Sequence, residues 1–214
     1  MIQQPVVLAT GNPHKVDELR PLLAEAGIAV VGLRDLPDWQ RFQEPAETGA
    51  TFEENAAIKA RAYAQQTGRW CLADDSGLEV DALEGAPGVI SSHYASRGID
   101  TGLSRPERDA ANNDALLAAL DGLPDAERTA RFVCVMCLAA PDGAIAARAR
   151  GTFEGAIGRP GDVPRGENGF GYDPLFVLED GRTSAELSPI EKNARSHRGH
   201  AARSMALLIA GLSC

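Results

Sequence analysis

Apolar and polar residues alternate near the start of the chain in a way that predicts a strand, a helix and a second strand. Short apolar runs at residues 5–10 and 28–33 predict the strands. Between them, apolar residues recur at helical spacing from about residue 15 to 26, and Gly27 follows at a C-cap position. Elements in this order indicate a sheet that contains parallel pairs.

The pattern continues to the end of the chain. Ser or Thr followed three residues later by Glu predicts helix starts at Thr51, Ser104 and Ser188. In chain order, the remaining predicted elements are a loop at 34–50, a helix at 52–66, strands at 70–73 and 78–83, a loop at 85–98, a helix at 104–120, a hairpin of strands at 129–140 and 144–151, a glycine-rich loop at 151–171, a strand at 175–178, a helical turn at 188–191 and a helix at 196–212. The pattern therefore predicts an α/β fold.

Composition narrows the class of protein. A length of 214 residues with 44% hydrophobic content fits one domain over residues 1–214. The net charge of −9 argues against a nucleic-acid partner. No stretch of about 20 apolar residues occurs, so we expect no membrane span and no membrane partner. Residues 1–5 lack the basic and apolar regions of a signal peptide, which predicts a cytoplasmic protein.

The four cysteines are Cys71, Cys134, Cys137 and Cys214. The second and third form a CxxC pattern, which can indicate a metal or redox site. They lie in an apolar run that predicts a buried strand, where residues three apart point to opposite faces. We therefore expect ordinary thiols with neither role.

The most informative polar stretch is Asp74-Asp75-Ser76-Gly77, which separates two apolar runs. Paired carboxylates at a strand end suit a hard divalent cation such as Mg²⁺ and an attacking water. Asp, Ser and Gly are also common turn residues, so an acidic β-turn without chemistry is the alternative.

Other polar stretches contain backbone N–H groups and lysines that could bind an anion. The loop Thr10-Gly11-Asn12-Pro13-His14-Lys15 joins a strand to a helix N-terminus, where free N–H groups bind anions. Lys15 lies at the wrong end of the helix dipole unless an anion offsets it. On helix 52–66, Lys59 falls at the edge of the apolar face, and Glu47 lies shortly upstream. The alternatives are a plain turn and a lysine that reaches water along the surface.

Two further stretches fit a nucleotide base. Phe170 stands between glycines in Phe170-Gly171-Tyr172-Asp173, so its ring can stack on a purine while Asp173 accepts a base N–H. The alternative is that both aromatics are core residues. The segment Lys192-Asn193-Ala194-Arg195-Ser196-His197-Arg198 places cations at the start of the last helix, which suits an anionic or keto-bearing ligand. Its alternative is a solvated basic face.

In order and spacing, these stretches together resemble the inosine triphosphate pyrophosphatase family, the non-canonical purine nucleoside triphosphate pyrophosphatases. The matching stretches are Leu8-Ala9-Thr10-Gly11-Asn12 with Lys15 and Glu18, Glu47-Thr48-Gly49 with Phe52, Glu54-Asn55-Ala56 and Lys59-Ala60, Ala73-Asp74-Asp75-Ser76-Gly77-Leu78, Gly85-Ala86-Pro87-Gly88, Phe170-Gly171-Tyr172-Asp173-Pro174 and Ser196-His197-Arg198-Gly199. The resemblance covers almost the whole chain. It departs at His93, where relatives often carry Arg, and at Asn168, which replaces a common Gly.

The resemblance implies a long mixed β-sheet flanked by helices, two lobes around a central cleft, and a homodimer. It also implies Mg²⁺-dependent hydrolysis of ITP, dITP and XTP to the monophosphate and pyrophosphate. The implied proton acceptor is Asp75, and the implied metal ligands are Glu47 and Asp75, with Asp74 in support. The residues expected to hold the phosphates are Thr10, Gly11, Asn12, Pro13, His14, Lys15 and Lys59. Those expected to contact the rest of the nucleotide are Ser76, Phe170, Gly171, Tyr172, Asp173, Lys192, His197 and Arg198.

Three alternatives remain open from the sequence. One is a Maf-like pyrophosphatase that acts on dTTP or modified pyrimidines. Another is a purine-nucleotide sensor without catalysis, which has no need of Asp74, Asp75 and Glu47 together. The last is a phosphatase-like hydrolase in which Asp74 is the nucleophile.

Overall fold

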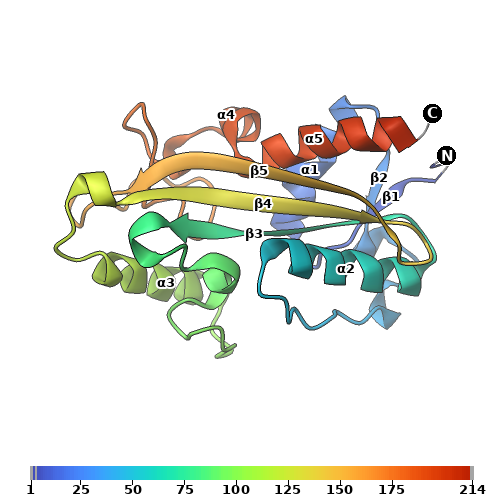
Figure 1. Ribbon diagram of the computed structural model, residues 1–214, viewed down its shortest axis with the longest axis horizontal. Helices are drawn as coiled ribbons and strands as arrows, with labels where there is room; N and C mark the ends of the chain where they lie inside the picture. The colour runs from blue at the N-terminus through green and yellow to red at the C-terminus, as the bar shows by residue number, and fades with distance from the viewer. Residues whose placement is uncertain (1, 3, 213–214) are drawn as a thin grey trace. The chain divides into compact units, whose positions relative to one another are not determined.

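The computed structural model describes residues 2 and 4–212, except for the side chain of His14 (Figure 1). The chain forms two compact units. Unit 1 contains the residues up to 76, residues 134–151 and the residues from 196 onward; unit 2 contains residues 77–133 and 152–195. A single domain over residues 1–214 and a cleft between two lobes stay predictions.

Six strands form one sheet in the order β2-β1-β3-β4-β5-β6. The strands are β1 (Val6–Leu8), β2 (Val30–Gly32), β3 (Cys71–Val80), β4 (Thr129–Ala139), β5 (Ile145–Ile157) and β6 (Phe176–Val177). β1 pairs in parallel with both β2 and β3, whereas β5 and β6 are antiparallel. The predicted α/β fold with a mixed sheet and flanking helices is confirmed.

The helices are α1 (Pro13–Glu25), α2 (Phe52–Thr67), α3 (Arg105–Ala119), α4 (Pro189–Arg195) and α5 (His197–Leu212). Their ends follow local signals that the sequence carries. The Thr51 hydroxyl accepts the Glu54 N–H at 3.2 Å, and Gly68 ends α2 in the left-handed conformation with φ of 64°. None of the described helices has the length and apolar character that a membrane span requires.

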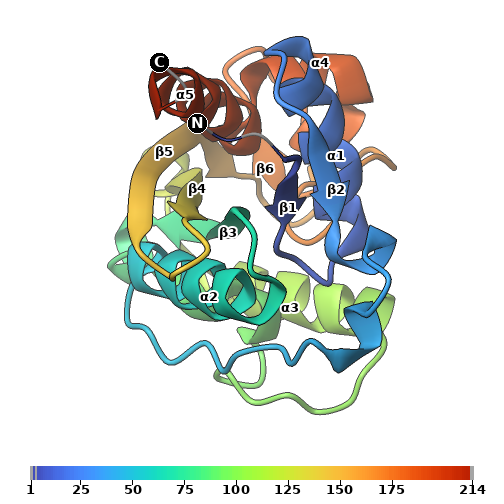
Figure 2. The same ribbon diagram turned by 90° about the vertical axis from the view of Figure 1, so that its right-hand side faces the viewer.

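In unit 1, α1 and α5 lie on one face of the strands and α2 lies on the other (Figures 1 and 2). The core on the side of α1 and α5 includes Leu8, Leu19, Leu72, Met136 and Met205, all of which are buried. Each such side chain contributes about 1.5–3 kcal/mol on burial, so this core can hold charged groups beside it.

Unit 2 has its own apolar core. Phe176 lies at its centre, with the rings of Phe132 and Phe153 at centroid distances of 4.6 and 5.6 Å. Leu116 of α3 and Tyr172 are also buried in this core. The segment from Phe170 to Asp173 is thereby anchored at Tyr172.

Two predicted boundaries are wrong. The acidic stretch from Asp74 to Gly77 is not a turn between two strands, because β3 runs through it without a break. Its turn propensity is overridden by tertiary contacts on both faces of the strand. β5 also continues to Ile157, so the glycine-rich loop begins later than predicted.

Glycine in β5 marks a close approach between elements rather than a loop. A Cβ at Gly151 would lie 2.6 Å from the backbone nitrogen of Ala201 and closer still to the carbonyl oxygen of His197. The first turn of α5 therefore rests directly on the strand at this glycine.

We expect Gly151→Ala to destabilise the protein by about 1–3 kcal/mol, because two backbone atoms and the Cβ of His200 face the added methyl group and none of them can rotate away. Urea unfolding followed by circular dichroism measures the change. Gly211→Ala is the matched control, since an added Cβ there meets nothing within 4 Å. Equal stability of the two variants would contradict the close packing of α5 on β5.

Candidate active site

β3 presents two adjacent carboxylates to opposite faces of the sheet. Side chains alternate along a strand, so Asp74 and Asp75 point in opposite directions. Only 3% of Asp74 and 8% of Asp75 is exposed. Buried carboxylates of this kind need cationic partners, and each finds a different set.

Asp74 faces cations from α1 and α5. Its Oδ2 lies 3.0 Å from Lys15 Nζ and 3.6 Å from Arg198 Nε. The guanidinium of Arg198 also donates to Glu18 and, at 3.0 Å, to the Ser76 hydroxyl. Burial alone raises the pKa of Asp74, but Lys15 and Arg198 outweigh burial and hold it well below its usual range. Asp74 is thus the anion that offsets the unfavourable position of Lys15 at the helix start.

Asp75 faces α2 on the other side. Lys59 Nζ donates to Asp75 Oδ1 at 3.0 Å and to Glu47 Oε2 at 2.7 Å. Burial lowers the pKa of Lys59, but the three nearby carboxylates outweigh burial and raise it. Burial raises the pKa of Asp75, with Lys59 and Lys15 opposing the rise and Glu47 adding to it. Asp75 Oδ2 is buried and has no hydrogen-bond partner in the described part of the chain.

The loop that carries Glu47 is held by the first turn of α2. Asn55 Oδ1 accepts the Gly49 N–H at 2.8 Å, and Glu54 Oε2 accepts the Ala50 N–H at 2.7 Å. A Cβ at Gly49 would lie 2.7 Å from Asn55 Oδ1, so the loop can sit this close only with glycine there. These contacts fix the backbone two residues beyond Glu47.

The predicted anion-binding loop begins where β1 ends. The Thr10 hydroxyl accepts the Asn12 N–H at 3.1 Å, and Pro13 is the first residue of α1. A hollow of about 150 Å³ opens beside this loop, and its charged lining residues are Asp17, Arg20, Arg34 and Asp35. The loop therefore combines a helix N-terminus with a hollow whose lining carries both signs of charge.

The donors around Asp75 fit a small hard cation in kind. No group of three or more His, Cys, Asp or Glu side chains in the described residues is placed to hold a metal ion. Glu47 and Asp75 do share Lys59, and Mg²⁺ is usually held by only one or two carboxylates plus substrate phosphates. The structure groups Asp74 with Lys15 and Arg198 instead, so its metal role stays a prediction.

In unit 2, the carboxylate of Asp173 organises a second cluster. Its Oδ2 accepts the Phe170 N–H at 2.8 Å and the Lys192 ammonium at 2.6 Å, and its Oδ1 accepts the Ser184 hydroxyl at 2.7 Å. Asp173 and Lys192 are both buried. Gly169 leaves room for this pair, since a Cβ there would lie 2.7 Å from Lys192 Nζ.

The two aromatics beside Asp173 have different environments. Tyr172 is buried and its hydroxyl donates to the Ser91 carbonyl at 2.8 Å. Phe170 is half-buried, as an aromatic that stacks on a ligand would be. The core alternative is therefore right for Tyr172 only.

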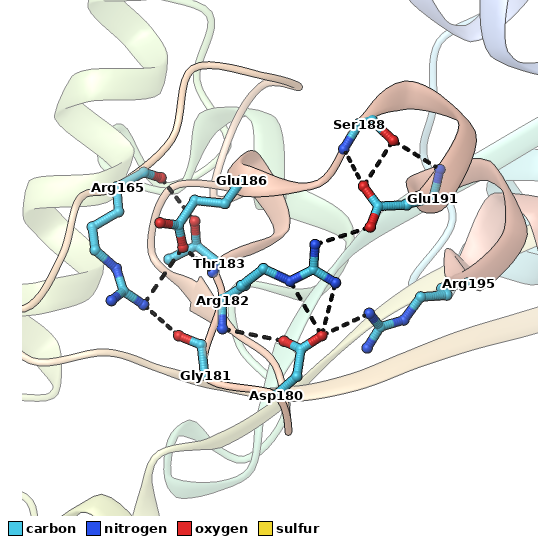
Figure 3. Close-up of polar contacts among 9 residues, drawn as sticks. All are labelled: Arg165, Asp180, Gly181, Arg182, Thr183, Glu186, Ser188, Glu191 and Arg195. Carbon is cyan, nitrogen blue, oxygen red and sulfur yellow. Dashed lines mark hydrogen bonds and ion pairs between the residues drawn. The ribbon is translucent and has the colours of Figure 1, made fainter.

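Figure 3 shows the charged network that holds α4, the helix that carries Lys192. Arg182 donates at 2.9 Å to both Asp180 and Glu191, and Arg195 donates to Asp180 at 3.0 Å. A single exposed pair contributes about 0–1 kcal/mol, but here two arginines share one carboxylate. The network fixes the helix against the preceding turn and thereby orients Lys192.

The predicted crowd of cations at the start of the last helix is wrong. Lys192 and Arg195 lie in the last turn of α4, the favourable end of a helix dipole for a cation. Ser196 then separates α4 from α5, and its hydroxyl accepts the Gly199 N–H at 3.1 Å. His197 and Arg198 are the first two residues of α5, and both are buried.

The two units share the predicted site residues between them. Thr10, Gly11, Asn12, Pro13, Lys15, Glu47, Lys59, Asp74, Asp75, Ser76, His197 and Arg198 belong to unit 1, and Phe170, Gly171, Tyr172, Asp173 and Lys192 belong to unit 2. The side chain of His14 lies outside what the structure describes. Cys134 approaches Asp74 at 3.9 Å and Cys137 approaches the Glu53 carbonyl at 3.9 Å, so the two thiols diverge as predicted, whereas Cys214 is outside the described residues.

From the sequence, Glu18 and Asn55 are named only within matching stretches and are assigned no contact, and Ser184 is not named. Glu18 binds Arg198 across a separation of 180 residues, Ser184 supports Asp173, and Asn55 anchors the loop of Glu47. Ser184 lies inside a capping-box pattern from Thr183 to Glu186, which is a signal that could have been read. The partner of Glu18 had no local signal.

Comparison with known proteins now defines the class. The model of the Ham1 family matches residues 6–207. A protein of Nitratidesulfovibrio vulgaris named dITP/XTP pyrophosphatase is 52% identical over 204 residues, which cover 95% of this chain and 94% of that protein. A protein of the same name from an Exiguobacterium species is 50% identical, with 94% of each chain covered.

A solved HAM1 protein structure from Coxiella burnetii has a TM-score of 0.82 and 40% identity, and covers 98% of this chain and 100% of that one. The chain belongs to the Ham1 family. The resemblance inferred from the sequence motifs is thereby confirmed.

We expect Asp74→Asn to destabilise the protein by about 3–5 kcal/mol, because Lys15 and Arg198 lose a buried counter-charge. In the wild type, the contribution of Asp74 to the free energy of unfolding should depend on pH. The folded pKa of Asp74 is depressed, so its stabilisation is complete above the unfolded value near 4 and is lost as pH falls toward the folded value. Urea unfolding between pH 3 and pH 7, at values spaced by about half a unit, measures both effects.

Asp142→Asn is the control, because the exposed Asp142 accepts the Ala144 N–H of its own turn and an amide oxygen can do the same. The acid limb of the stability curve should flatten in Asp74→Asn and keep its slope in the control. An unchanged acid limb in Asp74→Asn would show that the ion pairs contribute nothing.

Proposed function

We propose that this protein hydrolyses non-canonical purine nucleoside triphosphates, namely ITP, dITP and XTP, to the monophosphate and pyrophosphate. The observation that carries the proposal is Asp75, a buried carboxylate beside Lys59 and Glu47 whose Oδ2 has no hydrogen-bond partner among the described residues. Relatives that share about half of their residues with this chain bear the name dITP/XTP pyrophosphatase. Removal of such nucleotides would cleanse the nucleotide pool.

We further propose that Mg²⁺ is the metal and that Glu47 and Asp75 hold it, with Asp74 in support. When bound, the ion would neutralise charge on the phosphates. On the two faces of β3 together, three cations face four carboxylates, which leaves one negative charge in excess. That excess favours the binding of a further cation.

In this proposal, Asp75 accepts the proton of the attacking water. Its burial raises its pKa, which makes it a stronger base than an exposed aspartate. Lys15, Lys59 and the loop from Thr10 to Lys15 would bind the phosphates, because cations and free N–H groups stabilise negative charge that develops on phosphate oxygens. Each lysine is already oriented by a carboxylate, so little ordering remains on binding.

The base would be recognised by stacking and by hydrogen bonds. Phe170 supplies the stacking face, and Asp173 with Lys192 supplies an acceptor and a donor. His197 and Arg198 would donate to the 6-keto oxygen of the purine. The 6-amino group of adenine would leave such donors unpaired, which rejects ATP by orders of magnitude.

A homodimer, a cytoplasmic location and a single domain over residues 1–214 complete the proposal. They are supported by the resemblance and by composition, and size-exclusion chromatography with light scattering tests the dimer.

A substrate panel tests the function directly. With Mg²⁺ present, we expect ITP, dITP and XTP to yield monophosphate and pyrophosphate, and ATP and dTTP to react at least about 100-fold more slowly, because mismatched donors carry that order of cost. Product identification by anion-exchange chromatography distinguishes pyrophosphate from phosphate. Release of phosphate, or a preference for dTTP, would replace the proposal with the phosphatase-like or the Maf-like alternative.

Asp75→Asn tests the catalytic role. We expect kcat for ITP to fall by about 10²–10⁴-fold, the usual contribution of a general base, while nucleotide binding stays largely intact. Asp142→Asn again serves as the control and should match the wild type. Turnover within about tenfold of the wild type, a barrier change of roughly 1.4 kcal/mol, would contradict the role of Asp75.

A further inference from the structure

One edge of α3 holds the peptide groups that follow Phe170. Asp109 Oδ2 accepts the Gly171 N–H at 3.0 Å, and Asn113 Nδ2 donates to the Gly171 carbonyl at 3.2 Å. The two side chains are four residues apart and therefore lie on the same side of the helix. Gly171 adopts the left-handed conformation, with φ of 62°, and α3 fixes both sides of this turn.

Arg105 extends the same stripe by one turn. Its Cζ lies 4.3 Å from the centroid of the Phe170 ring, and its Nε lies 3.8 Å from Asp109 Oδ2. Arg105 is the first residue of α3, where the capping box of Ser104 and Glu107 fixes the start of the helix. The guanidinium therefore has a defined base and a carboxylate that orients it.

These contacts determine how the ring of Phe170 is presented. Its own N–H is bound by Asp173, the next peptide is bound by α3, and Arg105 covers one ring face at stacking distance. A guanidinium at 4.3 Å leaves no space for a base on that face. Lys192 Nζ lies 5.5 Å from the same ring centroid, so a second cation also lies near the ring.

We propose that Arg105 and Asp109 are positioning residues for purine recognition. They fix the orientation of the Phe170 ring on which the base would stack. This inference rests on the proposed function of Phe170 and adds two residues to it. Because both act through the ring, they should affect binding of the base and leave binding of the phosphates unchanged.

The test separates these two parts of the substrate. Isothermal titration calorimetry gives Kd for inosine monophosphate and for pyrophosphate, and steady-state assays give KM and kcat for ITP. We expect Arg105→Ala to weaken inosine monophosphate binding and to raise KM about three- to fivefold, the order of a cation–π contact, with kcat unchanged. Kd for pyrophosphate should stay at the wild-type value.

Conservative variants test the individual contacts of Arg105 and Asp109 separately. Arg105→Lys keeps a cation over the ring and should recover part of the loss. Asp109→Asn keeps an acceptor for the Gly171 N–H but loses the ion pair with Arg105, so we expect a smaller effect than in Asp109→Ala. Asp114→Asn is the control, because Asp114 is exposed on the same helix.

The outcomes are distinct. If Phe170→Ala weakens inosine monophosphate binding while Arg105→Ala and Asp109→Ala do not, the inference is wrong and the proposed function stands. Equal weakening of both ligands would show a merely structural role and would also overturn it. If the wild type and Asp114→Asn release no pyrophosphate from ITP, the proposed function fails, and the calorimetry still decides the role of Arg105. Should Asp109→Ala fail to fold, Arg105→Ala and Asp109→Asn carry the test.

Discussion

Buried charge has to be paired, and in unit 1 this requirement determines which elements surround β3. Asp74 and Asp75 are almost fully buried on opposite faces of one strand, so each face needs a cation. α1 and α5 supply Lys15 and Arg198 on one side, and α2 supplies Lys59 on the other. Removing a partner from such a pair costs about 3–5 kcal/mol, so the positions of three helices are coupled to two carboxylates.

Stability alone does not explain these acids. A buried ion pair is rarely better than apolar residues of similar volume, because desolvation offsets the attraction. Two apolar residues at positions 74 and 75 would continue the run from Cys71 and extend the core. A strand that carries two carboxylates and leaves Asp75 Oδ2 without a partner in the described chain breaks the rules of a stable core. Such exceptions are typical of functional sites.

Local signals predicted the helices and most strands, because a capping residue or a glycine acts within a few positions of the chain. Thr51, Ser104 and Ser196 cap helices as their types indicate. The turn predicted at Asp74 was wrong because the propensity of Asp for turns is a local signal. The cations that hold Asp74 within the strand come from segments far away in the sequence. The partner of Arg198 could not be predicted either, because Glu18 meets it only after α1 and α5 pack together.

Asp75 in unit 1 and Asp173 in unit 2 differ in how many hydrogen bonds their carboxylates accept. Asp173 accepts three donors, two on Oδ2 and one on Oδ1, so its position is fixed and little of its capacity is open. Asp75 accepts Lys59 on Oδ1, and its buried Oδ2 accepts no hydrogen bond from the described residues. A carboxylate that must take a proton from water needs an unused acceptor position, whereas one that orients a ring and a lysine is held by several donors. The difference in which oxygens are already used therefore supports the proposed roles of Asp75 in proton transfer and Asp173 in recognition.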